Sequence, residues 1–571
     1  MKENINWKIG GQAGYGIMVT GLMFAKTCLR HGWEVFCYTE YPSLIRGGHN
    51  TYQVHAAKDK VNSQKKKIEV LVALDQNTVT KHLLELSAGG VIIFDPEKVK
   101  VNLKKNLKVQ SLAIPIAKIS KEICDSDLMK DTVALGASLA LYKADFKILV
   151  SVIKDVFKSK SAEIIKQNIE AAKKGYDAVK PNSKIKVLAK LSKIKSASKI
   201  IVTGNEAIGL GALAAGCKFY VAYPMTPATA LLHFMAKNER AYDLVVKQAE
   251  DEIAVINMAI GASFTGVRSM CATSGGGFAL MNESFGFSGI AEIPLVLMEG
   301  QRTGPATGLP TWTGQGDLLF AINASHGEFL RIVVAPGDVQ EAFTAAVSAF
   351  NLAEKYQLPV IILTDKYLIE SPQSTKIFST KGIKIDRGQI LIQSQLNKIK
   401  DFKRYKFTSS GISPRSLPGA KGGEHQANSD DHDEYGFSTE DIKTRNRMMA
   451  KRAKKIQNLI KELPDPKIYG NKKASRTVIC WGSTKMPVLE ALKQNNNFKV
   501  VHLQYLCPFP VKFFTKNIIN PQKSMIIEGN HTAQLKQLIR QQTGLNISKT
   551  LLKYDGRPFY PEEIIEAVKR L

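Results

Sequence analysis

Val221-Ala-Tyr-Pro-Met-Thr-Pro-Ala-Thr229 decides the fold in the middle of this 571-residue chain. Its apolar start is typical of a buried parallel strand, and its two prolines then lead the chain into a rigid turn. Thr226 lies between these prolines, which hold its hydroxyl with little entropy to lose. Such a turn lies at the carboxyl edge of a parallel sheet, where ligands bind. An ordinary proline turn is the alternative.

A run of carboxylates, Glu250-Asp251-Glu252, precedes a small and apolar stretch, 253–262, that is typical of a buried helix. Acids at a helix N-terminus have a plain structural explanation, since they interact favourably with the helix dipole. A helix that is hydrophobic nearly all round, however, brings its first turn close to an interior or an interface. A carboxylate there would have a raised pKa and could hold or move a proton.

The stretch Glu299-Gly-Gln-Arg-Thr-Gly-Pro-Ala-Thr-Gly-Leu309 is a Gly/Pro-rich loop that follows another predicted strand. Its one arginine, Arg302, could match a carboxylate with two parallel hydrogen bonds, each contributing about 1.5–3 kcal/mol. A surface charge is the structural alternative for a lone loop arginine.

Three glycines follow a further strand, in Thr273-Ser-Gly-Gly-Gly-Phe278, and lead into a helix. Glycines at this place let the backbone approach a ligand closely. Phosphate binding is one interpretation of this turn. Near the N-terminus, Gly10-Gly-Gln-Ala-Gly-Tyr-Gly16 is a weak dinucleotide signal, because its spacing is not that of the GxGxxG fingerprint.

Strand and helix patterns alternate along most of the chain, which predicts an α/β protein with several doubly wound, mainly parallel sheets. The helix expected over 164–175 has amphipathic spacing and a glycine, Gly175, at its C-cap. We expect a first α/β domain, a Lys/Ser-rich linker, a second α/β domain, an irregular connecting segment and a smaller C-terminal α/β domain, with the ranges 1–185, 186–199, 200–384, 385–469 and 470–571.

Composition describes a soluble globular protein, with 44% hydrophobic residues and no apolar run long enough for a membrane span. We see no secretory signal and expect a cytoplasmic protein that does not bind membranes. The net charge of +28 invites a nucleic-acid interpretation, but the lysines are spread over the whole length and no nucleic-acid motif is present. We therefore expect no nucleic-acid partner; such a surface would steer acidic partners instead.

The seven cysteines are scattered and form no Cys-x-x-Cys pair. We therefore expect no iron–sulphur cluster and no structural zinc held by this chain alone. The polar segment 419–434 contains His425, His432 and several acids, and could bind a metal. Such a run is more often a solvated loop, and we assign no metal ligand in the chain.

In order and spacing, the Tyr-Pro-Met-Thr-Pro turn, the carboxylate run and the arginine loop resemble the α subunit of the 2-oxoacid:ferredoxin oxidoreductases. These are thiamine-diphosphate enzymes whose α chain carries a Tyr-Pro-Ile-Thr-Pro loop, so that Met225 stands where Ile is usual. The N-terminal glycine segment, with Tyr41-Pro-Ser-Leu-Ile-Arg-Gly-Gly48, resembles the family's γ domain. The resemblance implies a γ domain fused ahead of a pyrimidine-binding domain and a transketolase-like C-terminal domain.

The resemblance also implies roles for single residues. Glu252, with Glu250 as the fallback, would bind N1′ of the cofactor's aminopyrimidine. Thr226 would hydrogen-bond the 2-oxoacid and Arg302 would bind its carboxylate. Further residues are implied around them: Tyr223 and Thr303 on the substrate side, Arg46 at the mouth of the site near substrate or coenzyme A, and Ser274, Gly275 and Gly276 near the aminopyrimidine.

The reaction that the resemblance implies is the oxidative decarboxylation of a 2-oxoacid with coenzyme A, giving acyl-CoA, CO₂ and reduced ferredoxin. A β subunit would hold the diphosphate, Mg²⁺ and an iron–sulphur cluster, in a heterodimer or a dimer of heterodimers. The fused architecture favours 2-oxoglutarate; pyruvate and branched-chain 2-oxoacids are the alternatives. From another class, the rival is a nucleotide-binding scaffold protein whose first domain is the functional part.

Overall fold

The computed structural model describes residues 4–44, 47–103, 108–179, 185 and 189–571. These residues form two compact units: 1–202 with 370–377 and 560–565, and 203–369 with 378–559 and 566–571. Within the described residues, no helix is both long and apolar enough to cross a membrane.

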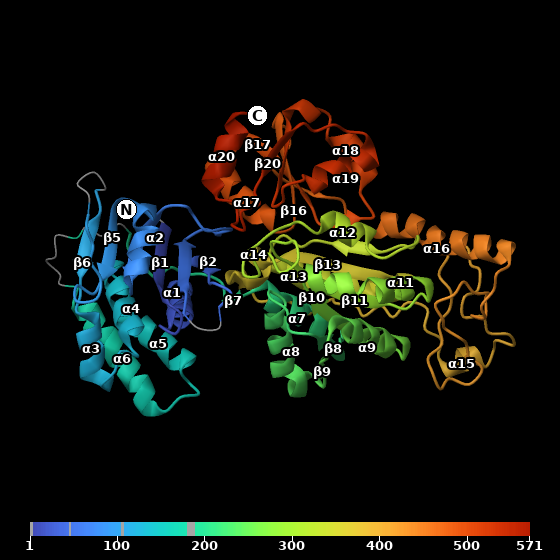
Figure 1. Cartoon of the computed structure of the whole chain (residues 1–571), viewed down its shortest axis with the longest axis horizontal. Helices are drawn as coiled ribbons and strands as arrows, with labels where there is room; N and C mark the ends of the chain where they lie inside the picture. The colour runs from blue at the N-terminus through green and yellow to red at the C-terminus, as the bar shows by residue number, and fades with distance from the viewer. Residues whose placement is uncertain (1–3, 45–46, 104–107, 180–184, 186–188) are drawn as a thin grey trace. The chain divides into compact units, whose positions relative to one another are not determined.

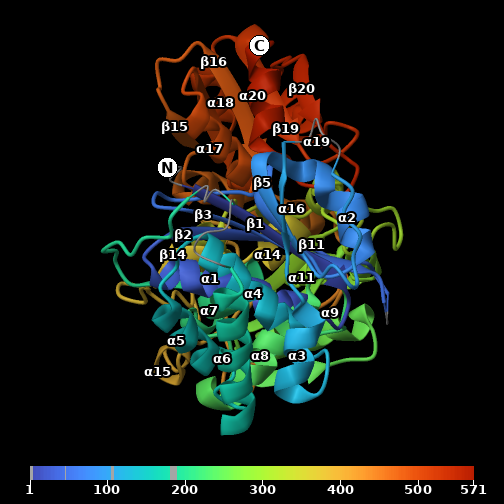
Figure 2. The same ribbon diagram turned by 90° about the vertical axis from the view of Figure 1, so that its left-hand side faces the viewer.

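The first unit is built on one eight-stranded sheet (Figures 1 and 2), in the order β6-β5-β4-β1-β3-β2-β14-β7. The four strands from β6 to β1 are parallel, and every later neighbour pair is antiparallel. The strands are β1 (Asn4–Gln12), β2 (Glu34–Glu40), β3 (His49–Ala57), β4 (Ile68–Ala73), β5 (Leu86–Phe94), β6 (Gln110–Ala113), β7 (Lys199–Val202) and β14 (Gln373–Lys376).

Helices cover both faces of this sheet, but unequally. The larger core lies under α1 (Ile17–Arg30), α4 (Lys130–Leu141) and α5 (Phe146–Val156), with α3 (Ile116–Cys124) and α6 (Ala162–Asp177) alongside them. The short α2 (Gln76–His82) and η1 (Leu83–Glu85) lie over a smaller core on the opposite face.

The predicted C-cap at Gly175 is wrong. Helix α6 continues to Asp177, and its C-cap is Ala178. A Cβ on Gly175 would collide with the backbone of Val133 in α4, and one on Gly136 would collide with Ala172 in α6. The two glycines therefore serve close packing between these helices, which a reading of one helix alone could not show.

The second unit contains a seven-stranded sheet in the order β18-β12-β13-β11-β10-β8-β9, parallel except for the β18–β12 pair. Five of its seven strands lie within a few residues of the ranges that the sequence predicts (219–223, 267–272, 294–298, 331–335 and 359–364), because these five are largely apolar runs; β9 and β18 were not predicted. The strands are β8 (Phe219–Ala222), β9 (Val245–Gln248), β10 (Ser269–Thr273), β11 (Leu295–Gln301), β12 (Ile332–Val334), β13 (Pro359–Asp365) and β18 (Tyr505–Cys507).

Both faces of the seven-stranded sheet are covered by helices (Figure 1). One face packs against α7 (Gly204–Ala214) and α13 (Val339–Tyr356), and the other contributes to a core with α9 (Glu252–Phe264), α10 (Gly275–Leu280), α11 (Asn282–Ile290) and α12 (Leu318–Asn323). Helix α8 (Thr229–Tyr242) follows the proline turn, and α14 (Lys366–Glu370) follows β13.

A third sheet lies in the C-terminal part of the second unit, in the order β15-β17-β16-β19-β20. It is parallel except for β15, and its core is continuous with that of the seven-stranded sheet. Its strands are β15 (Lys467–Gly470), β16 (Arg476–Trp481), β17 (Phe498–Leu503), β19 (Ser524–Glu528) and β20 (Lys549–Leu552). Its helices are α17 (Lys485–Gln494), α18 (Val511–Asn517), α19 (Gln534–Thr543) and α20 (Pro561–Lys569); η3 (Gly482–Thr484) and η4 (Pro521–Lys523) are 3₁₀ turns.

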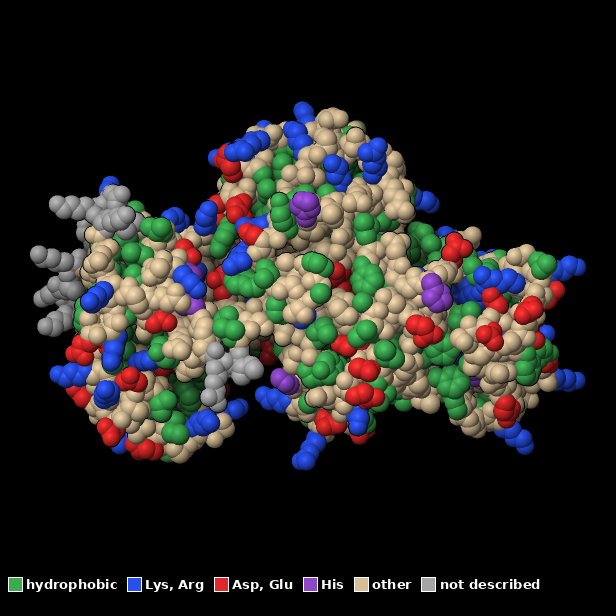
Figure 3. Space-filling view, in the orientation of Figure 1, with side chains coloured by type: hydrophobic (Ala, Val, Ile, Leu, Met, Phe, Trp, Pro, Cys, Tyr) green, Lys and Arg blue, Asp and Glu red, His purple; other side chains and the backbone are tan. Residues whose placement is uncertain are grey.

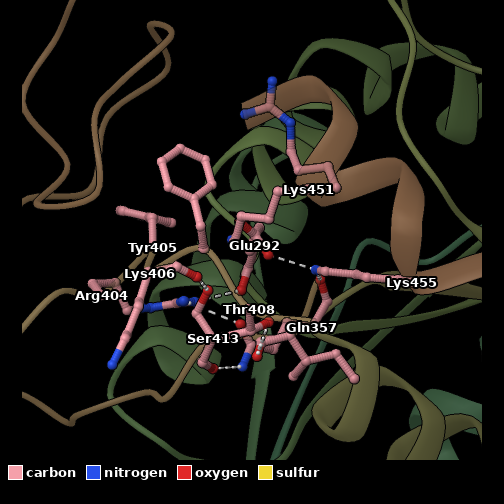
Figure 4. A network of polar contacts seen from close by, with 12 residues as sticks. Glu292, Gln357, Arg404, Tyr405, Lys406, Thr408, Ser413, Lys451 and Lys455 are labelled. Atoms are coloured by element: carbon pink, nitrogen blue, oxygen red, sulfur yellow. Dashed lines mark hydrogen bonds and ion pairs between the residues drawn. The ribbon is translucent and has the colours of Figure 1, made fainter. Parts of the chain in front are cut away.

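The segment predicted as irregular, 385–469, is mostly loop but contains the long helix α16 (Ile442–Glu462) and the short α15 (Gln393–Leu396). A network of buried charges ties α16 to the rest of the unit (Figure 4). Glu292 accepts ion pairs from Lys451 and, at 2.6 Å, from Lys455, while Arg404 donates to the Glu292 backbone carbonyl. Buried charges thus hold a helix whose sequence is mostly polar.

The predicted fold class, several mainly parallel α/β sheets with alternating helices, is confirmed. Strand β7 lies at the edge of the range predicted for the second domain, and β14 lies inside that range. Both strands nevertheless belong to the first sheet. We retain the five predicted ranges as a proposal, with the addition that 199–202 and 370–377 pack with the first unit. On the face shown in Figure 3, Lys and Arg side chains are spread out and mixed with acidic ones.

Candidate functional site at the carboxyl edge of the seven-stranded sheet

Four of the predicted site residues follow four neighbouring strands of the seven-stranded sheet. Thr226 follows β8, Glu252 follows β9, Ser274 follows β10 and Arg302 follows β11. These strands are parallel, so their carboxyl ends meet at one edge of the sheet. Residues from distant parts of the chain are thereby gathered where open α/β sheets bind ligands.

Arg302 and Thr226 are in direct contact. The Arg302 guanidinium donates through Nη1 to the backbone carbonyl of Thr226 at 2.8 Å. Gly300 packs closely here, since a Cβ on it would lie 2.9 Å from Ile369 and 3.3 Å from Pro227 of the turn. Within the described part of the chain, Arg302 has no ion pair and the Thr226 hydroxyl has no hydrogen bond, so both groups are available to a ligand.

The environment of Arg302 is partly buried. Burial lowers the pKa of its guanidinium, and the nearby Asp317 carboxylate raises it. A half-buried cation with unused donors is a suitable partner for a small carboxylic acid, because charge-assisted hydrogen bonds strengthen as water is excluded.

Tyr223 and Thr303 contribute to the shape of the two loops. Tyr223 is 39% exposed at the end of β8. The Thr303 hydroxyl donates to the Thr313 carbonyl at 2.8 Å, and its backbone bridges to Leu309. Thr303 therefore closes the arginine loop on itself.

Burial distinguishes the neighbouring acids of the carboxylate run. Glu252 is the first residue of α9 and is 3% exposed, whereas Glu250 is exposed. Asp251 is the N-cap, and its side chain accepts from the Ala254 amide at 2.8 Å. The helix-capping role thus falls to Asp251, and Glu252 keeps a buried oxygen, Oε1, with no hydrogen-bond partner among the described residues.

The three-glycine turn makes room for Glu252. A Cβ on Gly277 would lie 2.5 Å from Glu252 Oε1 and would overlap Thr273 Oγ1. A Cβ on Gly276, by contrast, would meet nothing within 4 Å, and this residue is exposed. The Ser274 hydroxyl is buried and lacks a partner among the described groups. Two buried polar atoms without a partner among the described residues, Glu252 Oε1 and Ser274 Oγ, thus lie close to the turn, whose middle glycine is open to solvent.

Burial also changes the proton affinity of Glu252. It raises the pKa of the carboxyl group, an effect that Asp251 reinforces and the Thr273 hydroxyl opposes. Thr273 lies in turn 3.8 Å, Oγ1 to Sδ, from Met225 of the proline turn. The carboxylate, the glycine turn and the Thr226–Arg302 pair are thus parts of one continuous patch.

Two acids of this patch were not predicted as site residues. Glu299, near the end of β11, is fully buried, and Asp317 lies beside both Glu299 and Arg302. Glu299 could have been predicted from the sequence, because it is an acid near the end of an apolar strand. No local pattern marks Asp317, whose position depends on the folding of the loop between Arg302 and α12.

Arg46 lies outside the described residues. In the polar loop 419–434, acids and histidines serve the local structure: Asp431 pairs with Arg445 and Arg452, and Asp433 accepts three backbone amides. His432 packs on the Tyr405 ring. Nowhere in the described parts of the chain do three His, Cys, Asp or Glu side chains gather as for a metal ion.

Two family descriptions match this chain. "Pyruvate flavodoxin/ferredoxin oxidoreductase, thiamine diP-bdg" matches residues 210–451, which include the whole candidate site. "Pyruvate ferredoxin/flavodoxin oxidoreductase" matches residues 6–178 of the first unit.

Similar proteins span the whole length. A 2-oxoacid:ferredoxin oxidoreductase subunit alpha from Sulfolobus sp is 33% identical over 99% of this chain and 96% of its own. A 2-oxoglutarate oxidoreductase subunit KorA from Mycobacterium tuberculosis is 26% identical over 98% and 90%. Among solved structures, the 2-oxoglutarate:ferredoxin oxidoreductase from Magnetococcus marinus, with 2-oxoglutarate, coenzyme A and succinyl-CoA bound, matches with a TM-score of 0.93 and 32% identity over 100% of both chains.

Proposed function

This chain belongs to the α subunits of the 2-oxoacid:ferredoxin oxidoreductases, and from this premise we propose that it binds and orients a 2-oxoacid, 2-oxoglutarate first of all, for CoA-dependent oxidative decarboxylation. The products are acyl-CoA, CO₂ and reduced ferredoxin. The preference for 2-oxoglutarate is supported by the names of two full-length relatives, and pyruvate and branched-chain 2-oxoacids are the alternatives.

The observation that carries this proposal is the patch itself: a buried carboxyl with an unused oxygen beside an open glycine turn, and next to it an arginine without an ion pair among the described residues. Thiamine diphosphate, when bound, supplies a carbanion for the 2-oxoacid carbonyl and an electron sink for the charge left by CO₂. The residues fit it, because Glu252 Oε1 lacks a partner among the described residues and a Cβ on Gly276 would point into open space.

Each group of the chain has a distinct part in this proposal. Glu252 holds a proton at Oε1 and shares it with N1′ of the aminopyrimidine, which its buried position favours. Arg302 binds the carboxylate of the acid, and the Thr226 hydroxyl hydrogen-bonds the acid beside it. Ser274, Gly275 and Gly276 face the aminopyrimidine, while Tyr223 and Thr303 shape the substrate side.

The proposal includes partners that complete the enzyme. A β subunit holds the diphosphate with Mg²⁺ and an iron–sulphur cluster, in a heterodimer or a dimer of heterodimers, and coenzyme A is the acyl acceptor. Arg46, in the first unit's sequence, is proposed to contact coenzyme A or the substrate.

The experiment is to purify the native complex and measure ferredoxin reduction with coenzyme A and a panel of 2-oxoacids. We expect an iron-containing smaller subunit to copurify, and 2-oxoglutarate to give the highest kcat/KM. A higher kcat/KM with pyruvate would correct the substrate. A complex with no 2-oxoacid-dependent reduction would contradict the proposal as a whole.

A further inference from the structure

A buried pair of carboxyl groups lies beside Arg302 and has no part in the proposed reaction. Glu299 is 0% exposed, and neither of its carboxylate oxygens meets a donor among the described residues. The Asp317 carboxyl lies next to it, and burial and the charge of Asp317 together raise the pKa of Glu299. Two ionised carboxylates can only accept, so this contact becomes a hydrogen bond when one of the two carries a proton.

Asp317 is held firmly in this position. Its backbone amide donates to Gln301 Oε1 at 3.0 Å, and the Gln301 side chain donates in turn to the Thr364 carbonyl at 3.1 Å. A Cβ on Gly275 would lie 2.6 Å from Asp317 Oδ2. The first glycine of the turn therefore accommodates Asp317, as the third accommodates Glu252.

Few charges face this pair. From β10, the register partner of Glu299 is Thr273, and from β13 it is Leu363; neither is charged. Asp365, at the end of β13, accepts a hydrogen bond from the Ser483 hydroxyl, with 2.6 Å between Ser483 Oγ and Asp365 Oδ2. Burial raises the pKa of both acids; among the described residues, Arg302 is the cation that acts on Asp317, and it lowers the pKa of Asp317 by less than burial raises it.

The consequence for charge is simple. Two buried carboxylates with one nearby cation cannot both ionise cheaply, so the pair retains one proton. With that proton, Glu299, Asp317 and Arg302 carry no net charge together. Without it they carry one negative charge, which would weaken the attraction of Arg302 for an acid.

We propose that Glu299 and Asp317 are a positioning pair that shares one proton and thereby keeps the charge of Arg302 available to the 2-oxoacid carboxylate. This inference rests on the role proposed for Arg302. It adds a control of substrate affinity, and neither acid needs to touch the substrate.

The first test is the pH dependence of KM and kcat for the 2-oxoacid in the assembled complex. In the native complex we expect KM to rise by up to about tenfold per pH unit once the pair loses its proton. In Glu299→Gln this rise should be absent while kcat changes little, because the amide donates to Asp317 and cannot ionise. Asp365→Asn, a buried carboxyl in the same sheet, serves as the control and should keep the native profile.

A second readout does not need activity. The difference infrared spectrum of native minus Glu299→Gln complexes should contain the carbonyl band of a protonated carboxylic acid at neutral pH, shifted in D₂O. An unaltered KM profile in Glu299→Gln, or the absence of this band from the difference spectrum when the variant is folded, would contradict the proposed pair. Inactivity of the native complex with every 2-oxoacid would contradict the proposed function instead, and the infrared band would still test the pair.

Discussion

Glu252 and Glu250 differ by two positions in the sequence, yet only Glu252 is buried at the site. The difference follows from the helix start: Asp251 caps α9, so the next residue turns inward and the previous one stays in solvent. Burial raises the pKa of the Glu252 carboxyl, which favours the proton-holding role that we propose for it.

We expect Glu252→Gln to lower kcat by about 10²–10⁴-fold, the usual range for loss of an acid–base group. Stability should change little, since Oε1 has no hydrogen-bond partner among the described residues. The measurement is steady-state turnover of the assembled complex, together with thermal unfolding. Glu250→Gln is the matched control and should keep native turnover; the reverse result would transfer the role to Glu250.

The glycine turn allows a steric test. Gly276→Ala should fold normally, because its Cβ meets nothing within 4 Å and alanine favours helix by up to about 1 kcal/mol. It should nevertheless raise the concentration of thiamine diphosphate needed for half-maximal activity, since the methyl group would occupy the open side of the turn that we propose faces the aminopyrimidine. The measurement is a cofactor titration of the cofactor-depleted complex.

Two further glycines serve as controls for that substitution. Gly261→Ala in α9 also meets nothing within 4 Å and should leave the titration unchanged. Gly277→Ala should destabilise the fold, because its Cβ would overlap Thr273 and crowd Glu252. An unchanged cofactor titration in Gly276→Ala would mean that the aminopyrimidine lies elsewhere.

At the scale of elements, α16 shows how charge replaces apolar burial. Burial raises the pKa of Glu292, but Lys451, Lys455 and Arg404 lower it more, so this carboxyl stays ionised. Burial lowers the pKa of Lys451 to about 7, against the attraction of Glu292. One carboxylate therefore pairs with two lysines and can neutralise the charge of only one of them (Figure 4).

This arrangement predicts unequal costs for its members. Glu292→Gln leaves two buried ammonium groups unpaired and should lower the free energy of unfolding by about 3–5 kcal/mol. Lys451→Met keeps the Lys455–Glu292 pair and a similar volume, and should cost less than about 1.5 kcal/mol. Urea unfolding of the full chain measures both. Equal losses in the two variants would show that the lysines do not compete for one carboxylate.

At the scale of the second unit, a buried ionic cluster joins the seven-stranded and five-stranded sheets. Glu341 of α13 pairs with Lys485 at 2.7 Å and with Lys467 at 3.0 Å. His502 of β17 lies 3.7 Å from Glu341, Nδ1 to Oε2, and is fully buried. Burial lowers the pKa of His502 to about 4, more than Glu341 raises it.

This histidine makes unfolding depend on pH in a defined window. Because its pKa is lower in the folded chain, the unfolded chain takes up the proton first as the pH falls from 6.5 to about 4. Stability present above pH 6.5 should therefore be lost across this window, by about 3 kcal/mol from this group. In urea unfolding, His502→Gln should remove this part of the dependence of the free energy of unfolding on pH. His233 is exposed, and His233→Gln should keep the native dependence. A native slope in His502→Gln would mean that other groups cause the acid loss.

Local sequence determined a large part of this protein. Apolar runs marked most strands of the seven-stranded sheet, and the motifs after them identified the family, which the full-length relatives confirm. The predicted site residues themselves remain predictions, although Thr226, Glu252 and Arg302 do lie at one edge. Such motifs can be predicted from the sequence because a strand, a turn and a helix start each depend on a few consecutive residues.

Tertiary structure alone decided the rest. It placed β7 and β14 in the first sheet, packed Gly175 against α4, buried Glu252 while leaving Glu250 exposed, and brought Asp317 close to Glu299 and Arg302. Each of these depends on contacts between residues far apart in the chain. Burial and the proximity of charges follow from how distant segments pack, and neither is a property of a short stretch of sequence.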